Sequence, residues 1–69
     1  MEIEMDGRYR KNIESGQLVE IVMKQHQQSG ELTEGFVKQI LTNAAFHPHG
    51  IKVKLATGEV GRVKNIIPE

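Results

Sequence analysis

Three histidines, His26, His47 and His49, are the residues best suited by type to metal chemistry. Imidazole is a common metal ligand, and the His47-x-His49 spacing could turn two rings toward one ion. A catalytic zinc site usually takes three protein ligands, however, and His26 falls in a different predicted loop. We therefore expect no metal site and no cofactor, and interpret His47 and His49 as loop residues that hydrogen-bond and brace the turn beside Pro48.

Residues for covalent or acid–base catalysis are scarce. The chain has no cysteine, and its only serines, Ser15 and Ser29, lie in predicted turns. No pair of carboxylates is spaced for acid–base work, and the glycines form neither GxGxxG nor GxxxxGK. A chain of 69 residues also cannot enclose a pocket of several hundred Å³ and still keep a core. We expect no enzymatic activity and no catalytic residue.

The cations of the C-terminal half are the remaining candidates for a binding site. Nine cations balance nine anions, but residues 1–34 carry four cations and seven anions, whereas residues 35–69 carry five and two. This asymmetry permits a local anion site in a neutral protein, because lysine and arginine contact nucleic-acid phosphates without reading base sequence. The alternative is a solvated strand face on which lysines maintain solubility. The candidate nucleic-acid-binding residues are Lys52, Lys54, Arg62, Lys64 and Lys38.

A β-hairpin is predicted to position these cations. Apolar residues and lysines alternate through IKVKL, and the alternation resumes after Gly58. A three-residue loop with Gly58 in the left-handed conformation is a known hairpin form. This loop pairs Ile51 with Val63 on the apolar face and Lys52 with Arg62 on the other, and a one-residue slip would turn every side chain over. Four cations then share one side of the hairpin.

A second hairpin, residues 18–26 with residues 32–41, is predicted upstream. A three-residue loop over residues 28–30 brings charge pairs and apolar pairs together, which supports this register. A helix is the competing interpretation, because the apolar spacing after residue 32 fits a helical stripe, but Gly35 would cost about 1 kcal/mol inside a helix. We favour strands, with Phe36 in the core. The expected partners are Glu20–Lys38, Lys24–Glu34, Val22–Phe36, Leu18–Ile40 and Ile21–Val37.

These elements predict an all-β fold, a small SH3-like (KOW/Tudor-like) barrel of four to five antiparallel strands. Residues 13–67 form the single domain, with a short edge from Ile13 or residues 66–67, and residues 1–12 form a flexible N-terminal tail. The cations around Tyr9 in this tail could grip a phosphate backbone, although a solvated tail is the more common outcome.

No membrane or secretory segment is expected. No window approaches the roughly 18 apolar residues of a membrane span, and residues 1–12 lack the apolar run of a secretory signal. The absence of cysteine fits a reducing compartment. We expect a cytoplasmic protein without a membrane partner.

Two long stretches carry a family resemblance: SGELTEGFVKQILT over residues 29–42, and HPHGIKVKL with GEVGRV over residues 47–63. With them, about residues 12–67 resemble the YwbE family of short bacterial proteins without an assigned function. The resemblance supplies no catalytic residues. The Gly58 hairpin is also similar, at fold level only, to the KOW-type strands of ribosomal and transcription proteins, which suggests RNA.

The sequence thus predicts binding of RNA, or of a ribonucleoprotein, through the cations of the second half. An aromatic platform for bases is missing from this prediction, because Phe36 is assigned to the core and only Tyr9 and Phe46 remain. The alternative is a non-enzymatic protein–protein interaction module that uses an exposed strand edge or the His47–Gly50 loop. A small metal-binding protein is a third class, which rests on the histidines alone.

Overall fold

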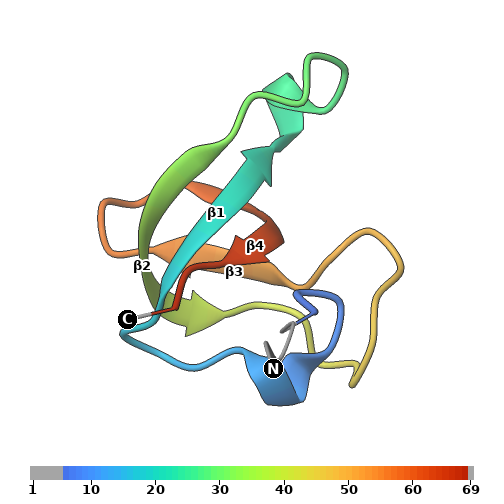
Figure 1. Ribbon diagram of the computed structural model, residues 1–69, viewed down its shortest axis with the longest axis vertical. Coiled ribbons are helices and arrows are strands. Elements are labelled where there is room, and N and C mark those ends of the chain that lie inside the picture. Colours follow the sequence, from blue (N-terminus) through green and yellow to red (C-terminus); the bar gives the residue numbers. More distant parts are fainter. Residues whose placement is uncertain (1–5, 69) are drawn as a thin grey trace.

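Four antiparallel strands form a closed barrel in the computed structural model, which describes residues 6–68 (Figure 1). They are β1 (Leu18–Met23), β2 (Thr33–Ile40), β3 (Lys52–Leu55) and β4 (Val60–Ile66). Each strand pairs with the next along the chain, and β4 returns to pair with β1. The predicted all-β, SH3-like barrel is confirmed. Among residues 6–68, no helix has the length and apolar character needed to span a membrane.

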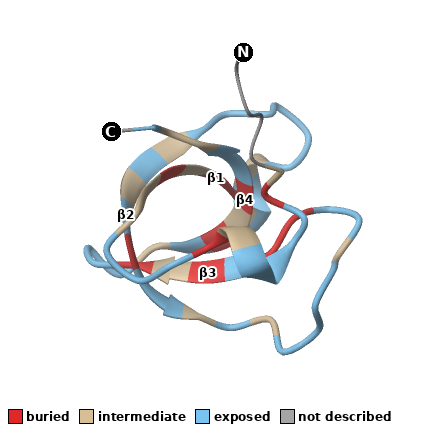
Figure 2. Cartoon of the chain, turned by 60° about the horizontal axis from the view of Figure 1, so that its bottom comes forward, coloured by how far each residue is buried: buried red, intermediate tan, exposed pale blue. Residues whose placement is uncertain are grey.

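The core is aliphatic and lies inside the ring of strands, where Figure 2 shows the buried positions. Strand residues alternate between the interior and the surface because successive side chains point to opposite faces of a sheet. Each large aliphatic side chain that leaves water contributes about 1.5–3 kcal/mol, so eight such residues form a sizeable core for a small domain. These residues are Ile13, Val19, Ile21, Val37, Ile51, Val53, Leu55 and Val63.

The β3–β4 hairpin has the predicted register. Gly58 adopts a φ of +102° in the loop, and its N–H donates to the Leu55 carbonyl at 2.9 Å. The Leu55 N–H in turn donates to the Glu59 carbonyl at 2.8 Å. Lys52 lies opposite Arg62 across the two strands. The loop chemistry of Gly58 therefore fixes which side chains share the outer surface of this hairpin.

The predicted register of the β1–β2 hairpin is wrong. A 3-10 turn, η2 (Lys24–His26), follows β1 directly, and a further turn is closed by the Gly30 N–H donating to the His26 carbonyl at 2.8 Å. This connection is longer than the expected three-residue loop, so Ile21 faces Thr33 instead of a residue four positions later. None of the five expected cross-strand pairs forms. The choice of strands over a helix is nevertheless confirmed.

The assignment of Phe36 to the core is also wrong. Phe36 lies opposite Leu18 on the outer surface of the barrel and is 53% exposed. Its neighbour Val37 points inward and is buried, and the two side chains of adjacent strand residues must face opposite ways. Val22, the expected partner of Phe36, pairs instead with Arg62 across β1 and β4.

Part of the predicted N-terminal tail is folded against the barrel. Residues 6–12, which include a second 3-10 turn, η1 (Arg10–Asn12), pair with the loop before β3. The Arg10 N–H donates to the Ala45 carbonyl, and the Ile51 N–H donates to the Gly7 carbonyl, both at 2.9 Å. Gly7 is buried because it lies against Val63, where a Cβ would come within 2.7 Å of a methyl carbon. The domain thus begins before residue 13, and residues 1–5 of the predicted tail lie outside the described part.

Candidate functional site

The outer surface of β3 and β4 carries a basic face formed by Lys52, Lys54, Arg62 and Lys64. Lys52 and Arg62 face each other directly, and Lys54 lies opposite Val60. One ion pair, Arg8–Asp6, and one histidine–carboxylate contact, His26–Glu31, occur within residues 6–68, and neither involves the basic face. Like charges directly opposite in a sheet are mildly destabilising. None of the four cations of the basic face therefore forms an ion pair with a described carboxylate.

Arg62 is held more firmly than the sequence suggests. Its side chain is half-buried, and one guanidinium nitrogen donates to the Gly50 carbonyl at 3.1 Å. A guanidinium has five N–H donors, so this bond fixes its position and leaves other donors for a ligand. The bond also ties the basic face to the loop that contains His47 and His49.

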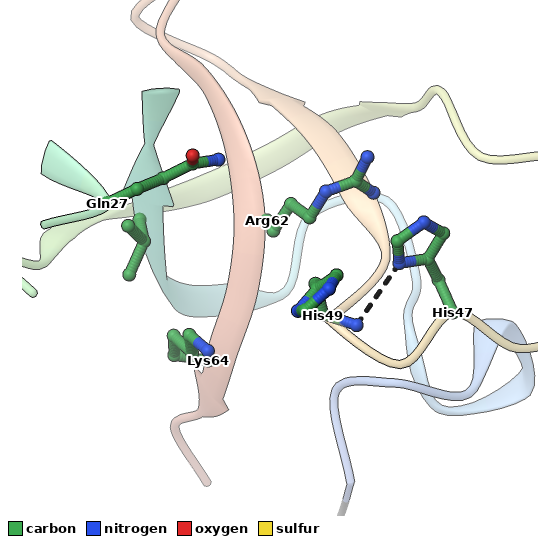
Figure 3. Close-up of a pocket in the computed structure, with 6 residues that line it drawn as sticks. Gln27, His47, His49, Arg62 and Lys64 are labelled. Carbon is green, nitrogen blue, oxygen red and sulfur yellow. Dashed lines mark hydrogen bonds between the residues drawn. The ribbon is translucent and has the colours of Figure 1, made fainter. Parts of the chain in front are cut away.

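A groove of about 590 Å³ opens beside Arg62 on the outside of the barrel. Figure 3 shows Arg62 reaching from β4 toward the two histidines, with Gln27 on the other side of the strand. Val22 supplies an apolar wall and is only 7% exposed, although it does not belong to the hydrophobic cluster inside the barrel. The groove is external to the barrel, so the core is not interrupted by it. Its lining residues are Val22, Gln27, His47, His49, Arg62 and Lys64.

His47 and His49 lie next to each other in this groove, with ring centroids 5.8 Å apart. The backbone N–H of His49 donates to Nδ1 of His47 at 3.1 Å, drawn as the dashed line in Figure 3. Partial burial, then the nearby charge of Arg62 and the ring of His49, lower the pKa of His47 below its usual value of 6.5. An anion in the groove would reverse these electrostatic effects and favour the protonated ring.

The third histidine does not join the other two. His26 lies at the end of η2, where its Nε2 is 3.6 Å from a Glu31 carboxylate oxygen. Within residues 6–68, no group of three histidine, cysteine, aspartate or glutamate side chains is placed to hold a metal ion. The histidine arrangement thus offers hydrogen-bond donors and a titrating group at the groove.

Lys38, the fifth predicted cation, lies apart from the groove lining. The pairing of β2 with β3 shifts between Val37 and Gln39, which places Lys38 at the irregularity. Its carbonyl accepts a hydrogen bond from the Ser15 hydroxyl at 3.4 Å. The next residue, Gln39, lies opposite Lys54. Lys38 therefore borders the basic face at its β2 side.

An aromatic pair, Tyr9 and Phe46, lies beyond the groove and was missed in the sequence. The two residues form an isolated antiparallel bridge, and their ring centroids are 4.9 Å apart at a tilt of 53°. The Arg8 guanidinium lies 5.8 Å from the Phe46 ring, and the Lys11 ammonium lies 6.0 Å from the Tyr9 ring. The sequence shows cations around Tyr9, but only the fold brings Phe46 to them.

Comparison with known proteins identifies a protein family. The family model described as "Uncharacterized conserved protein (DUF2196)" matches residues 6–66. The chain belongs to this family. It is also 51% identical over 63 residues to "Uncharacterized protein YwbE" of Bacillus subtilis (strain 168), which covers 91% of this chain and 97% of that protein. No solved structure matches the chain.

The predicted resemblance to the YwbE family is thereby confirmed, and the family match extends further toward the N-terminus than expected. It begins at residue 6, where the described structure also begins. This agrees with the pairing of residues 6–12 against the loop before β3. The segment that carries Tyr9 therefore belongs to the family's matched region.

Proposed function

We propose that this protein is a non-enzymatic RNA-binding protein of the cytoplasm that contacts phosphates through its basic face. The observation that carries the proposal is the direct opposition of Lys52 and Arg62 on a surface where no described carboxylate pairs with them. Such an arrangement costs stability in the free protein. A polyanion laid across the two strands would convert this repulsion into attraction.

The groove supports the same proposal. Arg62 and Lys64 supply positive charge, the two histidines and Gln27 supply hydrogen-bond donors, and no carboxylate lines the groove among the described residues. Phosphate oxygens are acceptors only, so a lining of donors and cations suits them. The bond from Arg62 to Gly50 holds the guanidinium in place before a ligand arrives, which lowers the entropic cost of binding.

Salt dependence is the signature of this mode of binding. Cations that neutralise phosphates release condensed counterions, and each contact adds about 0.7 to the magnitude of the log–log salt slope for a single strand. With about four contacts, the slope for single-stranded RNA should be on the order of −3.

The test is fluorescence anisotropy of a labelled single-stranded RNA over a range of salt concentrations. We choose Lys52→Gln/Lys64→Gln because both side chains are exposed, whereas Arg62 also supports the Gly50 loop. The double variant should flatten the slope to about −1.5. Lys24→Gln, a control that removes an exposed cation of η2 outside the basic face and the groove lining, should leave the slope unchanged. Unchanged RNA affinity in the folded double variant would exclude the basic face.

A protein–protein interaction module is the second candidate function. The exposed strand edge on which that alternative relied is absent from the described barrel, because each of its four strands is paired on both sides. One observation still favours a protein partner: Phe36 and Leu18 form an apolar pair on the outer surface of β1 and β2. Pull-down from lysate with and without nuclease separates the two candidates, since nuclease should abolish capture mediated by RNA.

A further inference from the structure

The aromatic side chains of this protein lie on its surface. The chain has one tyrosine, two phenylalanines and no tryptophan, and the buried core contains none of them. Aromatic rings bury more apolar surface than most side chains, so a small domain gains most from placing them inside. Here Tyr9 and Phe46 are 40% and 41% exposed. Their position on the surface is not explained by the stability of the core.

The two rings form a compact platform. Tyr9 comes from the segment before η1 and Phe46 from the loop before β3, and the bridge between their backbones fixes both. Flanking hydrogen bonds hold this bridge: Arg10 N–H to the Ala45 carbonyl, and His47 N–H to the Arg8 carbonyl, both at 2.9 Å. The rings are in contact but tilted by 53°, so each keeps an outward surface open to solvent.

Cations surround this aromatic pair. Arg8 lies near the Phe46 ring but is also paired with Asp6 at 2.6 Å. Lys11 lies near the Tyr9 ring, and it forms no ion pair with a carboxylate of residues 6–68. Rings with guanidinium or ammonium groups beside them stack well on nucleobases, because a base offers a flat π-face and its backbone offers negative charge.

Hydrogen bonds link the segment of the aromatic pair to the strand that carries part of the basic face. Thr42 connects them: its hydroxyl accepts a hydrogen bond from the Lys52 N–H at 2.8 Å, and its carbonyl accepts one from the Arg10 side chain at 3.0 Å. On the other side, Phe46 is followed directly by His47 of the groove. The pair is thereby linked to the basic face through Thr42 and to the groove through His47.

We propose that Tyr9 and Phe46 form a base-stacking site for single-stranded RNA. This assignment rests on the proposed function, and it adds what the basic face lacks, a preference for unpaired bases over duplex. Phosphate contacts alone bind any polyanion. Stacking requires an accessible base face, so inorganic polyphosphate cannot use it, and duplex RNA can offer it only at its ends.

Intrinsic fluorescence gives a direct readout, because Tyr9 is the single tyrosine and there is no tryptophan. Single-stranded RNA should quench Tyr9 emission, after correction for absorbance by the RNA. Inorganic polyphosphate of similar charge should bind the basic face without quenching. Duplex RNA of the same sequence should quench much less at equal occupancy.

Variants of the two exposed phenylalanines provide the matched comparison. Phe46→Leu should weaken single-stranded RNA binding by about 5- to 150-fold, the range that corresponds to the measured effect of losing one stacked base. Phe36→Leu, on the outer surface of β2, should leave the affinity unchanged. Tyr9→Phe keeps a ring and should bind like the parent, whereas Tyr9→Leu should resemble Phe46→Leu.

The outcomes separate the two proposals. Salt-dependent RNA binding without quenching of Tyr9, and with equal affinity for Phe46→Leu and Phe36→Leu, would overturn the stacking site and leave the basic face intact. No RNA binding at low salt would overturn both. If Phe46→Leu does not fold, quenching by single-stranded RNA but not by polyphosphate in the parent chain still decides the question.

Discussion

Lys52 and Arg62 lie directly opposite each other across β3 and β4, two positive charges in one cross-strand pair. Opposite charges at such positions contribute roughly 0.2–1 kcal/mol, and like charges are destabilising. Lys52→Glu should therefore raise the free energy of unfolding by up to about 1 kcal/mol at low salt, and the gain should shrink as salt is added. Urea denaturation at two salt concentrations measures both effects.

The control for this prediction is Lys54→Glu. It makes the same charge change on the same strand, but Lys54 lies opposite the apolar Val60. A gain of equal size in Lys54→Glu would mean that overall charge, and not the Lys52–Arg62 pair, limits stability.

The titration of His47 should report the charge of the groove. Partial burial, Arg62 and His49 lower the pKa of His47 from 6.5, so the folded state binds its proton less readily than the unfolded chain. The contribution of His47 to the free energy of unfolding is therefore fully present above about pH 6.5. It is lost as the pH falls through the lower folded pKa. NMR of the His47 ring measures the folded value directly.

Two changes should move this pKa upward. Arg62→Gln removes a neighbouring positive charge, and inorganic phosphate in the groove adds a negative one. In His47→Gln, the free energy of unfolding should fall less below pH 6.5 than in the parent, because the imidazole of residue 47 is gone. A His47 pKa at or above 6.5 in the free protein would contradict the geometry of the groove.

Gly50 should be far less tolerant of substitution than Gly58. Their φ angles are +103° and +102°, so alanine meets the same backbone strain at both, roughly 1–2 kcal/mol. A Cβ at Gly50 would also come within 2.4 Å of the Val63 carbonyl oxygen, whereas nothing lies within 4 Å at Gly58. Thermal denaturation should show a much larger loss for Gly50→Ala than for Gly58→Ala. Equal losses would show that Gly50 does not approach β4 closely.

Replacement of Ile51 and replacement of Phe36 by alanine should reduce stability by very different amounts. Ile51 is fully buried in the core, and its truncation should cost about 2–5 kcal/mol. Phe36 is 53% exposed on the outer surface, and its loss should cost about 1 kcal/mol or less. Chemical denaturation of the two variants provides the comparison. A larger loss of stability for Phe36→Ala than for Ile51→Ala would show that the Phe36 ring lies in the core. That result would refute the β1–β2 register.

The sequence predicted the parts of the fold that depend on local chemistry. The alternation around Gly58 determined the β3–β4 register and so the basic face, because one loop type satisfied the apolar pattern. The β1–β2 register failed because η2 lengthened the connection, and the polar run after Met23 does not signal such a turn. Phe36 was misplaced for a different reason: a shift of four positions leaves each side chain on the same face, and Phe36 is a large apolar residue on the outward face of β2.

The candidate site was predictable only in part. Its cations and histidines follow from the sequence, but the groove requires the contact between β1 and β4 that brings Val22 beside Arg62. The aromatic pair depends on the bridge between residues 9 and 46, which are far apart along the chain. Such tertiary contacts leave no periodicity or motif in the sequence, so they cannot be predicted from it.

Backbone amide shifts on adding single-stranded RNA at low salt show directly whether the basic face binds RNA. The largest changes should fall at Lys52, Arg62 and Lys64, with little change at Leu18 and Phe36 on the outer surface of β1 and β2. Shifts centred on Leu18 and Phe36, or no shifts at all, would mean that the basic face does not bind RNA.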